Sequence, residues 1–178
     1  MSGTKEQYVS VIGKAKSLFM KKTEDYGTAW RVLRTISIID QIYIKAQRIR
    51  TIQEKGTQLI PDDIHAEFQG IINYGIIGLI QLHLTDEDPE ELLVQAVEVQ
   101  YDRYAYAAKA LMEQKNHDYG EAWREMSQQS FVDLILMKLQ RMKQILMNKG
   151  QTLVSEGLDA NYLDIINYAV FALILSNE

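Results

Sequence analysis

The sequence predicts an all-α protein, a helical bundle made of two tandem three-helix repeats that pack about a pseudo-twofold axis. Three observations predict it. A ten-residue stretch, Lys22 to Arg31, returns as Lys115 to Arg124, with every equivalent position 93 residues further on. Apolar residues recur at spacings of three and four, without sustained alternation of period two. The third helical run of each half is apolar on nearly all sides, which suits the centre of a bundle.

The duplication reaches beyond this stretch, and many of its shared residues are charged or aromatic rather than apolar. After one inserted residue the offset becomes 94. The further pairs are Gln7-Tyr8 with Gln100-Tyr101, Ser37 with Ser130, Asp40 with Asp133, Lys45 with Lys138, Gln47-Arg48 with Gln140-Arg141, Gly56 with Gly150, and Ile71 to Tyr74 with Ile165 to Tyr168. Such internal repetition indicates a tandem array. We therefore expect residues 1–84 and 85–178 to be two repeats of one globular domain.

End signals place the helices of the first repeat. The first is expected to begin with Thr4 as N-cap and to stop near Gly27. The second should run from about residue 28 to 55. It is expected to kink or restart near Ser37, because Ser37-x-x-Asp40 is close to a capping box. The third should open at Pro61, with proline at its first position, and reach about residue 84.

The second repeat is read in the same way. Its first helix is expected to begin at Asp88-Pro89 and to reach about Lys115. The next two helices should cover roughly residues 121–149 and 155–176, with Ser130-x-x-Asp133 as the second near-capping box.

Composition excludes several classes of protein. The chain has 178 residues, no cysteine, 24% charged residues and a net charge of −5. Absence of cysteine excludes disulfides and thiolate metal sites, and a reducing cytoplasm is the expected location. The negative charge argues against a general nucleic-acid binder. The longest apolar runs are shorter than the ~20 residues that cross a bilayer, so we expect no membrane partner.

The repeated corner between the first two helices is the first candidate site. Lysine and arginine there can hold a phosphate, the aromatic rings can stack on a base, and the aspartate can orient the cations. The competing interpretation is a structural corner, with glycine as C-cap and tryptophan in the core. The candidate ligand-binding residues of this corner are Lys22, Asp25, Tyr26, Trp30 and Arg31, and Lys115, Asp118, Tyr119, Trp123 and Arg124.

Recurring polar residues on the other two helices are the second set. Lys45 and Arg48, and their equivalents Lys138 and Arg141, are one helical turn apart and can grip one phosphate together; alternatively they form a solvated face. Asn73 and Asn167 lie within apolar helices, and a buried amide needs partners. These asparagines belong either to a polar site or to hydrogen bonds across the bundle.

The second repeat also carries a candidate metal set, Glu156, Asp159 and Asp164. Glu156 and Asp159 are one turn apart, and Mg²⁺ prefers carboxylate oxygens together with substrate phosphate. The alternative is that both acids merely suit the first turn of a helix. In the first repeat Gly70 stands opposite Asp164, so that half lacks the complete set.

The corner followed by Lys-x-x-Arg and by Asp-Ile-Ile-Asn-Tyr-Ala resembles the nucleotide modification associated domain 1 family, in two copies that cover nearly the whole chain. The resemblance implies a link to modified nucleotides. It implies as motif residues Lys115, Asp118, Tyr119, Gly120, Lys138, Arg141, Asp164, Asn167 and Tyr168. More distantly, the all-α plan looks like MazG-type nucleoside triphosphate pyrophosphatases, although their Glu-Glu-x-x-Glu signature is missing.

Two functions follow. The first is binding of a small nucleotide or other phosphate compound, with Mg²⁺ as the expected cofactor; as an enzyme it would hydrolyse a phosphoanhydride. In that case Lys115, Lys138 and Arg141 neutralise phosphate, and Tyr119 or Trp123 stacks. The second is a non-catalytic helical module that binds a protein partner. Both functions are compatible with a homodimer.

Overall fold

The protein is helical throughout the residues that its computed structural model describes, which are 3–60, 63–152 and 156–177, and no strand occurs among them. The all-α prediction is confirmed. The elements are α1 (Thr4–Tyr26), the 3₁₀ turn η1 (Ala29–Val32), α2 (Thr35–Lys55), α3 (Ile64–Leu82), α4 (Val94–Tyr119), the 3₁₀ turn η2 (Ala122–Glu125), α5 (Gln128–Met147) and α6 (Leu158–Ser176).

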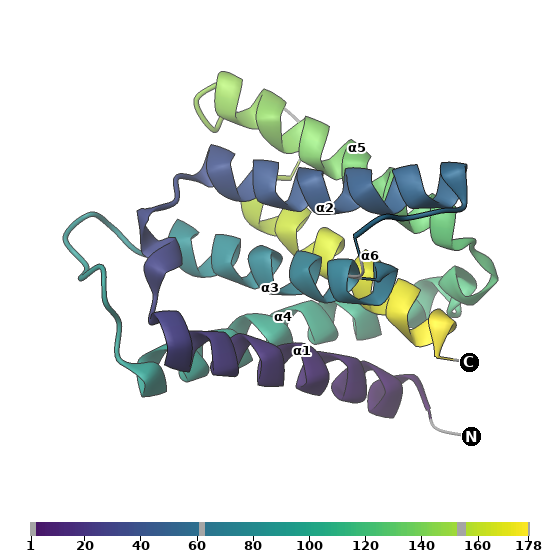
Figure 1. Cartoon of the computed structure of the whole chain (residues 1–178), viewed down its shortest axis with the longest axis horizontal. Helices are drawn as coiled ribbons and strands as arrows, with labels where there is room; N and C mark the ends of the chain where they lie inside the picture. Colours follow the sequence, from purple (N-terminus) through teal and green to yellow (C-terminus); the bar gives the residue numbers. More distant parts are fainter. Residues whose placement is uncertain (1–2, 61–62, 153–155, 178) are drawn as a thin grey trace.

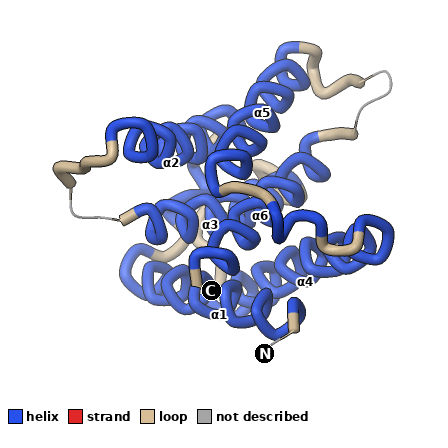
Figure 2. The backbone as a smooth tube through the Cα atoms, turned by 90° about the vertical axis from the view of Figure 1, so that its right-hand side faces the viewer, coloured by secondary structure: helices blue, strands red, loops and turns tan. Residues whose placement is uncertain are grey.

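The helices form three stacked pairs, each with one member from either repeat. In Figure 1 and in the perpendicular view of Figure 2, α2 and α5 lie along one side, α3 and α6 in the middle, and α1 and α4 along the other side. The middle pair is buried on almost every face, as its apolar sequence predicts. Equivalent helices therefore lie side by side, and the two halves share a single core.

Two equivalent hydrogen-bond pairs connect the repeats inside that core. The buried Tyr8 hydroxyl of α1 donates to Oδ1 of Asn167 on α6 at 2.6 Å, and the Tyr101 hydroxyl of α4 donates to Oδ1 of Asn73 on α3 at 2.7 Å. Each amide nitrogen donates to a helix carbonyl at 3.0 Å, from Asn73 to Ala15 and from Asn167 to the equivalent Ala108. Burial raises the pKa of both tyrosines far above its usual value. The asparagines are thus satisfied across the bundle.

Ion pairs on the outer layer repeat the same symmetry. Arg50 on α2 lies 4.0 Å from Asp133 on α5, and the equivalent Lys143 on α5 lies 3.4 Å from Asp40 on α2. The repeated aspartates therefore face the partner helix and do not cap their own.

The predicted restart of the second helix near Ser37 is confirmed, whereas the prediction that Ser37 and Ser130 are caps was wrong. After η1 the chain passes Leu33 in extended conformation and α2 starts at Thr35. In the second repeat Ser127 is the N-cap of α5 and its hydroxyl accepts from the Ser130 backbone nitrogen at 3.2 Å. The break precedes the serines because each 3₁₀ turn tucks a tryptophan inward before the next helix begins.

Other helix ends also differ from expectation. The N-cap of α1 is Gly3 rather than Thr4, and α3 begins after Asp63, whose carboxylate accepts from the Ala66 nitrogen at 2.8 Å. The expected start at Pro61 lies outside the described residues, as does the expected start of α6 at Ser155. Helix α4 extends to Tyr119, beyond the expected end near residue 115.

Asp88-Pro89 does not open a helix, which corrects the sequence prediction. Asp88 instead closes a turn in which its carboxylate accepts from the Thr85 backbone nitrogen at 2.8 Å. Helix α4 begins only at Val94, after extended Leu93. Short-range cap and proline signals look alike for a turn and a helix start, so the tertiary contacts of the linker decide between them.

Gly27 ends α1 as predicted, and Gly120 ends α4 in the same way. Both have a φ of 62°, which favours glycine, and each backbone nitrogen bonds to the helix carbonyl four residues back at 2.8 Å. Gly27 has a second reason to lack a side chain, because the Glu91 carboxylate occupies the space where a Cβ would lie. Thr28 then donates its backbone nitrogen to that carboxylate at 3.2 Å.

Candidate functional site: two equivalent pockets

Each repeat has a pocket at the same place, between the end of its first helix, its 3₁₀ turn and its third helix. The pocket of the first repeat, here the α1–α3 pocket, has a volume of about 580 Å³. The pocket of the second repeat, the α4–α6 pocket, has about 200 Å³. Ligand sites commonly span about 300–1,000 Å³, so only the first falls within the usual range. Equivalent pairs that line both are Lys22 and Lys115, Tyr26 and Tyr119, Trp30 and Trp123, Gly70 and Asp164, Asn73 and Asn167, and Tyr74 and Tyr168.

Charge in the α4–α6 pocket is organised around one buried acid. Asp164 is 5% exposed, and its two carboxylate oxygens contact two lysines, Lys115 Nζ at 2.8 Å and Lys138 Nζ at 2.9 Å. Burial alone would lower the pKa of Lys115, but the hydrogen bond to Asp164 and its charge outweigh burial, so the pKa is raised. Both recurring lysines of this repeat are therefore used internally.

The α1–α3 pocket has the same lysines without the acid between them. Gly70 takes the place of Asp164, and a Cβ on Gly70 would lie 2.8 Å from Cε and 3.1 Å from Nζ of Lys45. Lys45 Nζ lies 3.8 Å from the carboxylate of Glu67 and 5.8 Å from the ring centre of Tyr74. Lys22 is exposed and makes no hydrogen bond or ion pair with the described residues. The wall of the α1–α3 pocket that Lys22 and Lys45 form is therefore positively charged.

The acid of the third helix that pairs with the recurring basic residues sits at a different turn in the two repeats. Glu67 of α3 receives Arg48 Nη1 at 3.0 Å, whereas its equivalent Asn161 donates to the Gly157 carbonyl at 2.7 Å. Arg141, the equivalent of Arg48, is exposed and makes no hydrogen bond or ion pair with described residues. The acid therefore lies beside the arginine in the first repeat and between the lysines in the second.

Aromatic side chains differ in how far they close each pocket. Trp123 is 7% exposed and stacks on Phe171 with ring centres 4.1 Å apart. Ile77 replaces Phe171 in the first repeat, so Trp30 has no equivalent ring partner. The Trp123 indole nitrogen donates to Asn116 Oδ1 at 3.1 Å, but the buried Trp30 indole nitrogen has no acceptor among the described residues. The residue equivalent to Asn116 in the first repeat is Thr23, and its hydroxyl donates to the Phe19 carbonyl at 2.9 Å.

The repeated arginines of the corner hold neighbouring segments rather than the pockets. Arg31 donates to three carbonyls of the linker, those of Thr85, Asp88 and Pro89, at 3.1–3.2 Å, and to Gln81. Gln81 also donates to the carbonyls of the η1 turn. Arg31 therefore fixes the path from α3 to α4.

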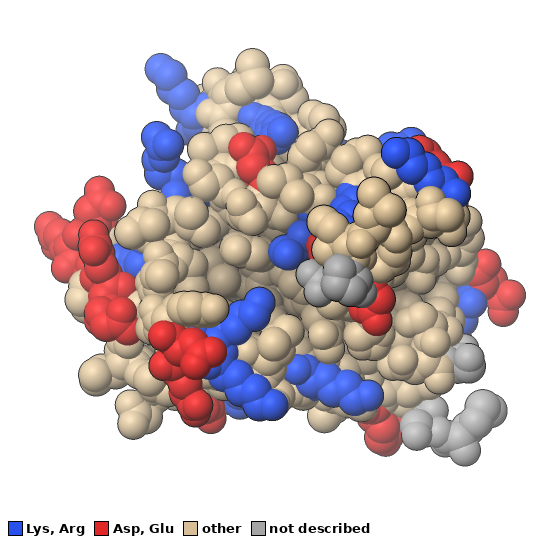
Figure 3. Space-filling model, in the orientation of Figure 1, with Lys and Arg blue, Asp and Glu red and all other residues tan. Residues whose placement is uncertain are grey.

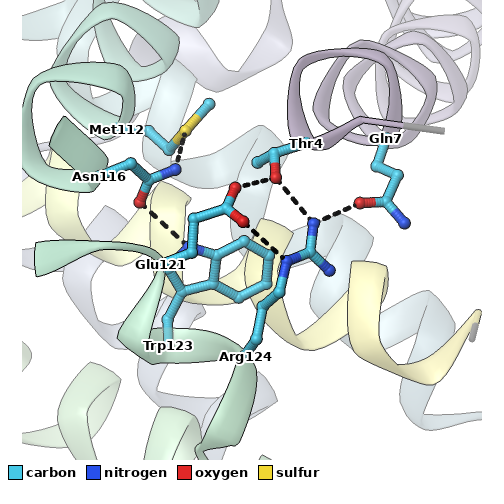
Figure 4. Close-up of polar contacts among 7 residues, drawn as sticks. All are labelled: Thr4, Gln7, Met112, Asn116, Glu121, Trp123 and Arg124. Carbon is cyan, nitrogen blue, oxygen red and sulfur yellow. Dashed lines mark hydrogen bonds and ion pairs between the residues drawn. The ribbon is translucent and has the colours of Figure 1, made fainter. Parts of the chain in front are cut away.

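Arg124 serves the equivalent purpose at the start of α1. It donates to Glu121 at 3.2 Å, to Gln7 at 2.6 Å and to Thr4 at 2.7 Å, and it lies over the Trp123 ring (Figure 4). The hydrogen bond from Thr4, followed by Arg124, holds the pKa of Glu121 below its usual range. These groups line a hollow of the surface of about 1,080 Å³ and largely satisfy one another.

The acids and tyrosines of the corner point outward. Asp25 is exposed and Asp118 contacts only its neighbour His117, at 3.0 Å, among the described residues. Tyr26 and Tyr119 are 70% and 73% exposed, although each lines the mouth of its pocket. The tyrosines can therefore cover a ligand, whereas the aspartates do not reach the pockets.

A sequence-family comparison adds independent information. The family model described as nucleotide modification associated domain 1 matches the chain twice, at residues 22–82 and 115–175, which together exceed half of its length. The chain belongs to this family. Comparison with curated proteins and comparison with solved structures gave no match. The distant likeness to MazG-type pyrophosphatases remains an architectural analogy that no comparison supports.

The family matches coincide with the two pocket units. Each begins at the pocket lysine, Lys22 or Lys115, and ends in the third helix of its repeat. The matched segments of this nucleotide modification associated domain 1 protein therefore contain nearly every side chain that lines the two pockets, while most of α1 and α4 lies outside them.

The expected metal set is not gathered into one group. No three His, Asp or Glu side chains of the described residues are placed to hold a metal ion together. Glu156 and Asp159 are exposed, and Asp164 contacts the two lysines instead. Magnesium remains a prediction for this family member.

Three pocket features could not be recognised from the repeat alone. Glu67 was missed because its equivalent is an asparagine, and Phe171 because its equivalent is an isoleucine. The exchange of Gly70 for Asp164 was noticed, but only as a missing metal ligand. The residues that differ between repeats, rather than those that recur, distinguish the two pockets.

One helix passes a length-and-composition test for membrane spans among the described residues, α6, and 67% of its tested window is buried inside the bundle. The core helix of a soluble bundle passes the same test, so this observation adds no membrane function.

The space-filling view shows Lys and Arg side chains around the hollowed middle of one face, with acids gathered near the linker between α3 and α4 (Figure 3).

Proposed function

We propose that the protein binds a nucleotide or nucleotide derivative in the α1–α3 pocket of its first repeat, in keeping with its family's link to nucleotide modification. The observation that carries the proposal is the pocket itself. It combines a volume of about 580 Å³ with two lysines, Lys22 and Lys45, and with aromatic rings in its lining, those of Tyr26, Trp30 and Tyr74. A nucleotide offers both an anion for the lysines and a base that stacks on aromatic rings.

The size of the pocket and its unsatisfied groups support this choice over the second repeat. The α4–α6 pocket is smaller than ordinary ligand sites, and Asp164 already neutralises its lysines. In the first repeat the Trp30 indole nitrogen has no acceptor among the described residues, and Lys22 has no acid. A ligand with anionic and acceptor atoms would satisfy both.

Phosphoanhydride hydrolysis with Mg²⁺ is the finer form of the proposal. In this form the lysines would neutralise the phosphates. The Mg²⁺ ion would bind to the substrate's phosphate oxygens, and exposed acids near the pocket would contact that bound ion. Because no three-residue acidic group occurs among the described residues, any ion would be held largely by the ligand's own phosphate oxygens.

A second candidate, a helical scaffold that binds only a protein partner, is favoured by a different observation. Arg31, Arg124, Asn73 and Asn167 all make structural hydrogen bonds, so recurrence of these residues needs no ligand.

A thermal-shift screen separates the two. The ligands are AMP, GMP, CMP, UMP, dTMP and their triphosphates, each with and without Mg²⁺. A ligand at 100 times its Kd stabilises the folded state by about 2.7 kcal/mol, which is measurable. Stabilisation of the native protein, reduced in a Lys22→Ala, Lys45→Ala variant, supports nucleotide binding. If no member of the panel shifts the melting temperature, nucleotide binding is contradicted and the scaffold function is favoured.

A further inference from the structure

We infer that the anionic group of the ligand sits over Gly70, between Lys22 and Lys45, where the second repeat places the carboxylate of Asp164. This inference rests on the proposed function and specifies how the ligand is oriented. It comes from comparing one repeat with the other, because the α4–α6 pocket already contains an anion of its own.

The carboxylate of Asp164 defines the geometry of an anion in this fold. Its oxygens lie 2.8 Å from Lys115 Nζ and 2.9 Å from Lys138 Nζ, so the two ammonium groups grip it from two helices, α4 and α5. A phosphate oxygen pair would make the same contacts, since charge-assisted N–H···O bonds have similar lengths for carboxylate and phosphate.

The first repeat presents the same grip without the carboxylate. Lys22 and Lys45 come from the equivalent helices, α1 and α2, and line the pocket together with Gly70. Glycine costs about 1 kcal/mol within a helix relative to alanine, so its presence in the interior of α3 requires a reason. Here the flexible end of Lys45 lies across the glycine, with its Cε 2.8 Å from where a Cβ would be, so Gly70 lets the ammonium group rest against α3.

The two lysines at the anion site have no acid between them to balance their charge. Among the described residues, Glu67 is the only acid that lines the α1–α3 pocket. It is engaged by Arg48 at 3.0 Å, and Lys45 lies at the longer distance of 3.8 Å. Lys45 is therefore able to turn toward a ligand without leaving a buried acid unpaired.

An anion over Gly70 also fixes where the rest of the ligand lies. The other lining residues include Tyr26, Trp30 and Tyr74, and Tyr26 is exposed at the mouth. A base attached to that phosphate would extend toward these rings. The ligand class is thus a nucleotide whose phosphate contacts Lys22 and Lys45 and whose base reaches these rings.

The test places a carboxylate in the first pocket. Gly70→Asp should give Lys22 and Lys45 an internal anion, and Gly70→Asn is the uncharged control of equal size. Both are expected to fold, because the group that an added Cβ would meet is the flexible end of Lys45. The probes are the nucleoside 5′-monophosphate with the largest shift in the screen and the corresponding nucleoside without phosphate, with affinities measured by calorimetry.

We expect the native chain to bind one monophosphate per chain. Gly70→Asp should weaken the monophosphate at least tenfold and the nucleoside by less than threefold, and Gly70→Asn should retain most of the phosphate preference. Equal losses in the Asp and Asn variants, an unchanged monophosphate affinity in Gly70→Asp, or two equal sites per native chain would each overturn the inference while leaving nucleotide binding intact.

A second variant keeps the test decisive should Gly70→Asp not fold. Lys45→Met should abolish the preference for the monophosphate over the nucleoside, whereas Lys14→Met, which removes an exposed lysine of α1 that lines neither pocket, should not. A preserved preference in Lys45→Met overturns the inference. Binding of no nucleotide by the native chain is a distinct result, since it overturns the proposed function itself.

Discussion

The pocket of the first repeat and that of the second are built from equivalent helices and share lysine, tyrosine, tryptophan and asparagine, yet their volumes are about 580 and 200 Å³. Two exchanges account for much of the difference. Asp164 in place of Gly70 fills the space between the lysines, and Phe171 in place of Ile77 stacks on the tryptophan. Duplication supplies two copies of one framework, and a few substitutions are enough to close one copy and leave the other open.

The core around these pockets behaves differently, because its polar contacts are the same in both repeats. The two asparagine–tyrosine pairs match in partners and nearly in length, at 2.6 and 2.7 Å. Perturbations of the core should therefore be equal in the two halves, whereas perturbations of the pockets should be unequal.

The largest expected effect tests the symmetric part. Asn73→Leu and Asn167→Leu should each lower the free energy of unfolding by about 3 kcal/mol, since each leaves a buried tyrosine hydroxyl without its acceptor and removes the amide's hydrogen bond to a helix carbonyl. Urea unfolding at neutral pH measures both. The double variant Asn73→Leu, Tyr101→Phe should lose less than the sum of its single changes. Losses differing by more than 1.5 kcal/mol between the two asparagines would contradict a symmetric core.

The next effect tests the asymmetric part. Asp164→Asn should lower the free energy of unfolding by about 2 kcal/mol, because it leaves Lys138, whose side chain is 12% exposed, and the half-exposed Lys115 without their counter-charge. Its counterpart Glu67→Gln should cost less, since the longer and partly exposed contacts of Glu67 are easier to replace. Equal losses in the two variants would show that Asp164 is not the centre of the second pocket.

A smaller gain should come from giving the first repeat a contact that the second already has. Thr23→Asn should raise the free energy of unfolding by about 1 kcal/mol, because it supplies the Trp30 indole nitrogen with an acceptor equivalent to Asn116. Thr23→Ala, which supplies none, is the control and should not stabilise. An asparagine variant no more stable than the alanine variant would rule out the missing acceptor as a source of instability.

The smallest effect concerns pH. Because the pKa of Lys115 is raised in the folded protein by Asp164, its contribution to stability is complete below its ordinary pKa of 10.5 and is lost as the pH rises through the higher folded value. The stability difference between the native protein and Lys115→Met should therefore be a few tenths of a kcal/mol, up to about 1, at neutral pH and shrink above pH 10.5. Lys22→Met, without an ion pair among described residues, should show no such difference. Guanidinium unfolding across this range provides the measurement.

Much of the framework could be read from the sequence, and the reason is local. Periodicity of apolar residues and the glycine at position 27 are encoded by near neighbours along the chain, and the internal repeat is visible in the linear sequence. They predicted the helices, the ends of α1 and α4 within a few residues, and a central pair formed by α3 and α6. Signals at Asp88 and Ser37 misled because a cap, a turn and an ion-pair partner use the same residue types.

The candidate site was only partly accessible to the same reasoning. Some of the recurring side chains line a pocket, among them those of Lys22, Trp30 and Asn73, and their part in ligand binding stays a prediction. Recurrence could not separate the pocket lysines from Arg31 and Arg124, which look equally suited to phosphate but bind backbone and side chains of distant segments.

The sequence by itself determined the duplicated all-α framework and the set of recurring polar residues, because helix periodicity and repeats are properties of the linear chain. Only the tertiary structure decided which of those residues meet. Asp164 reaches two lysines that are 49 and 26 residues away along the chain, while the equivalent lysines face a glycine. Distance through space sets the strength of an ionic contact, and packing of α3 and α6 against the outer helices fixes that distance.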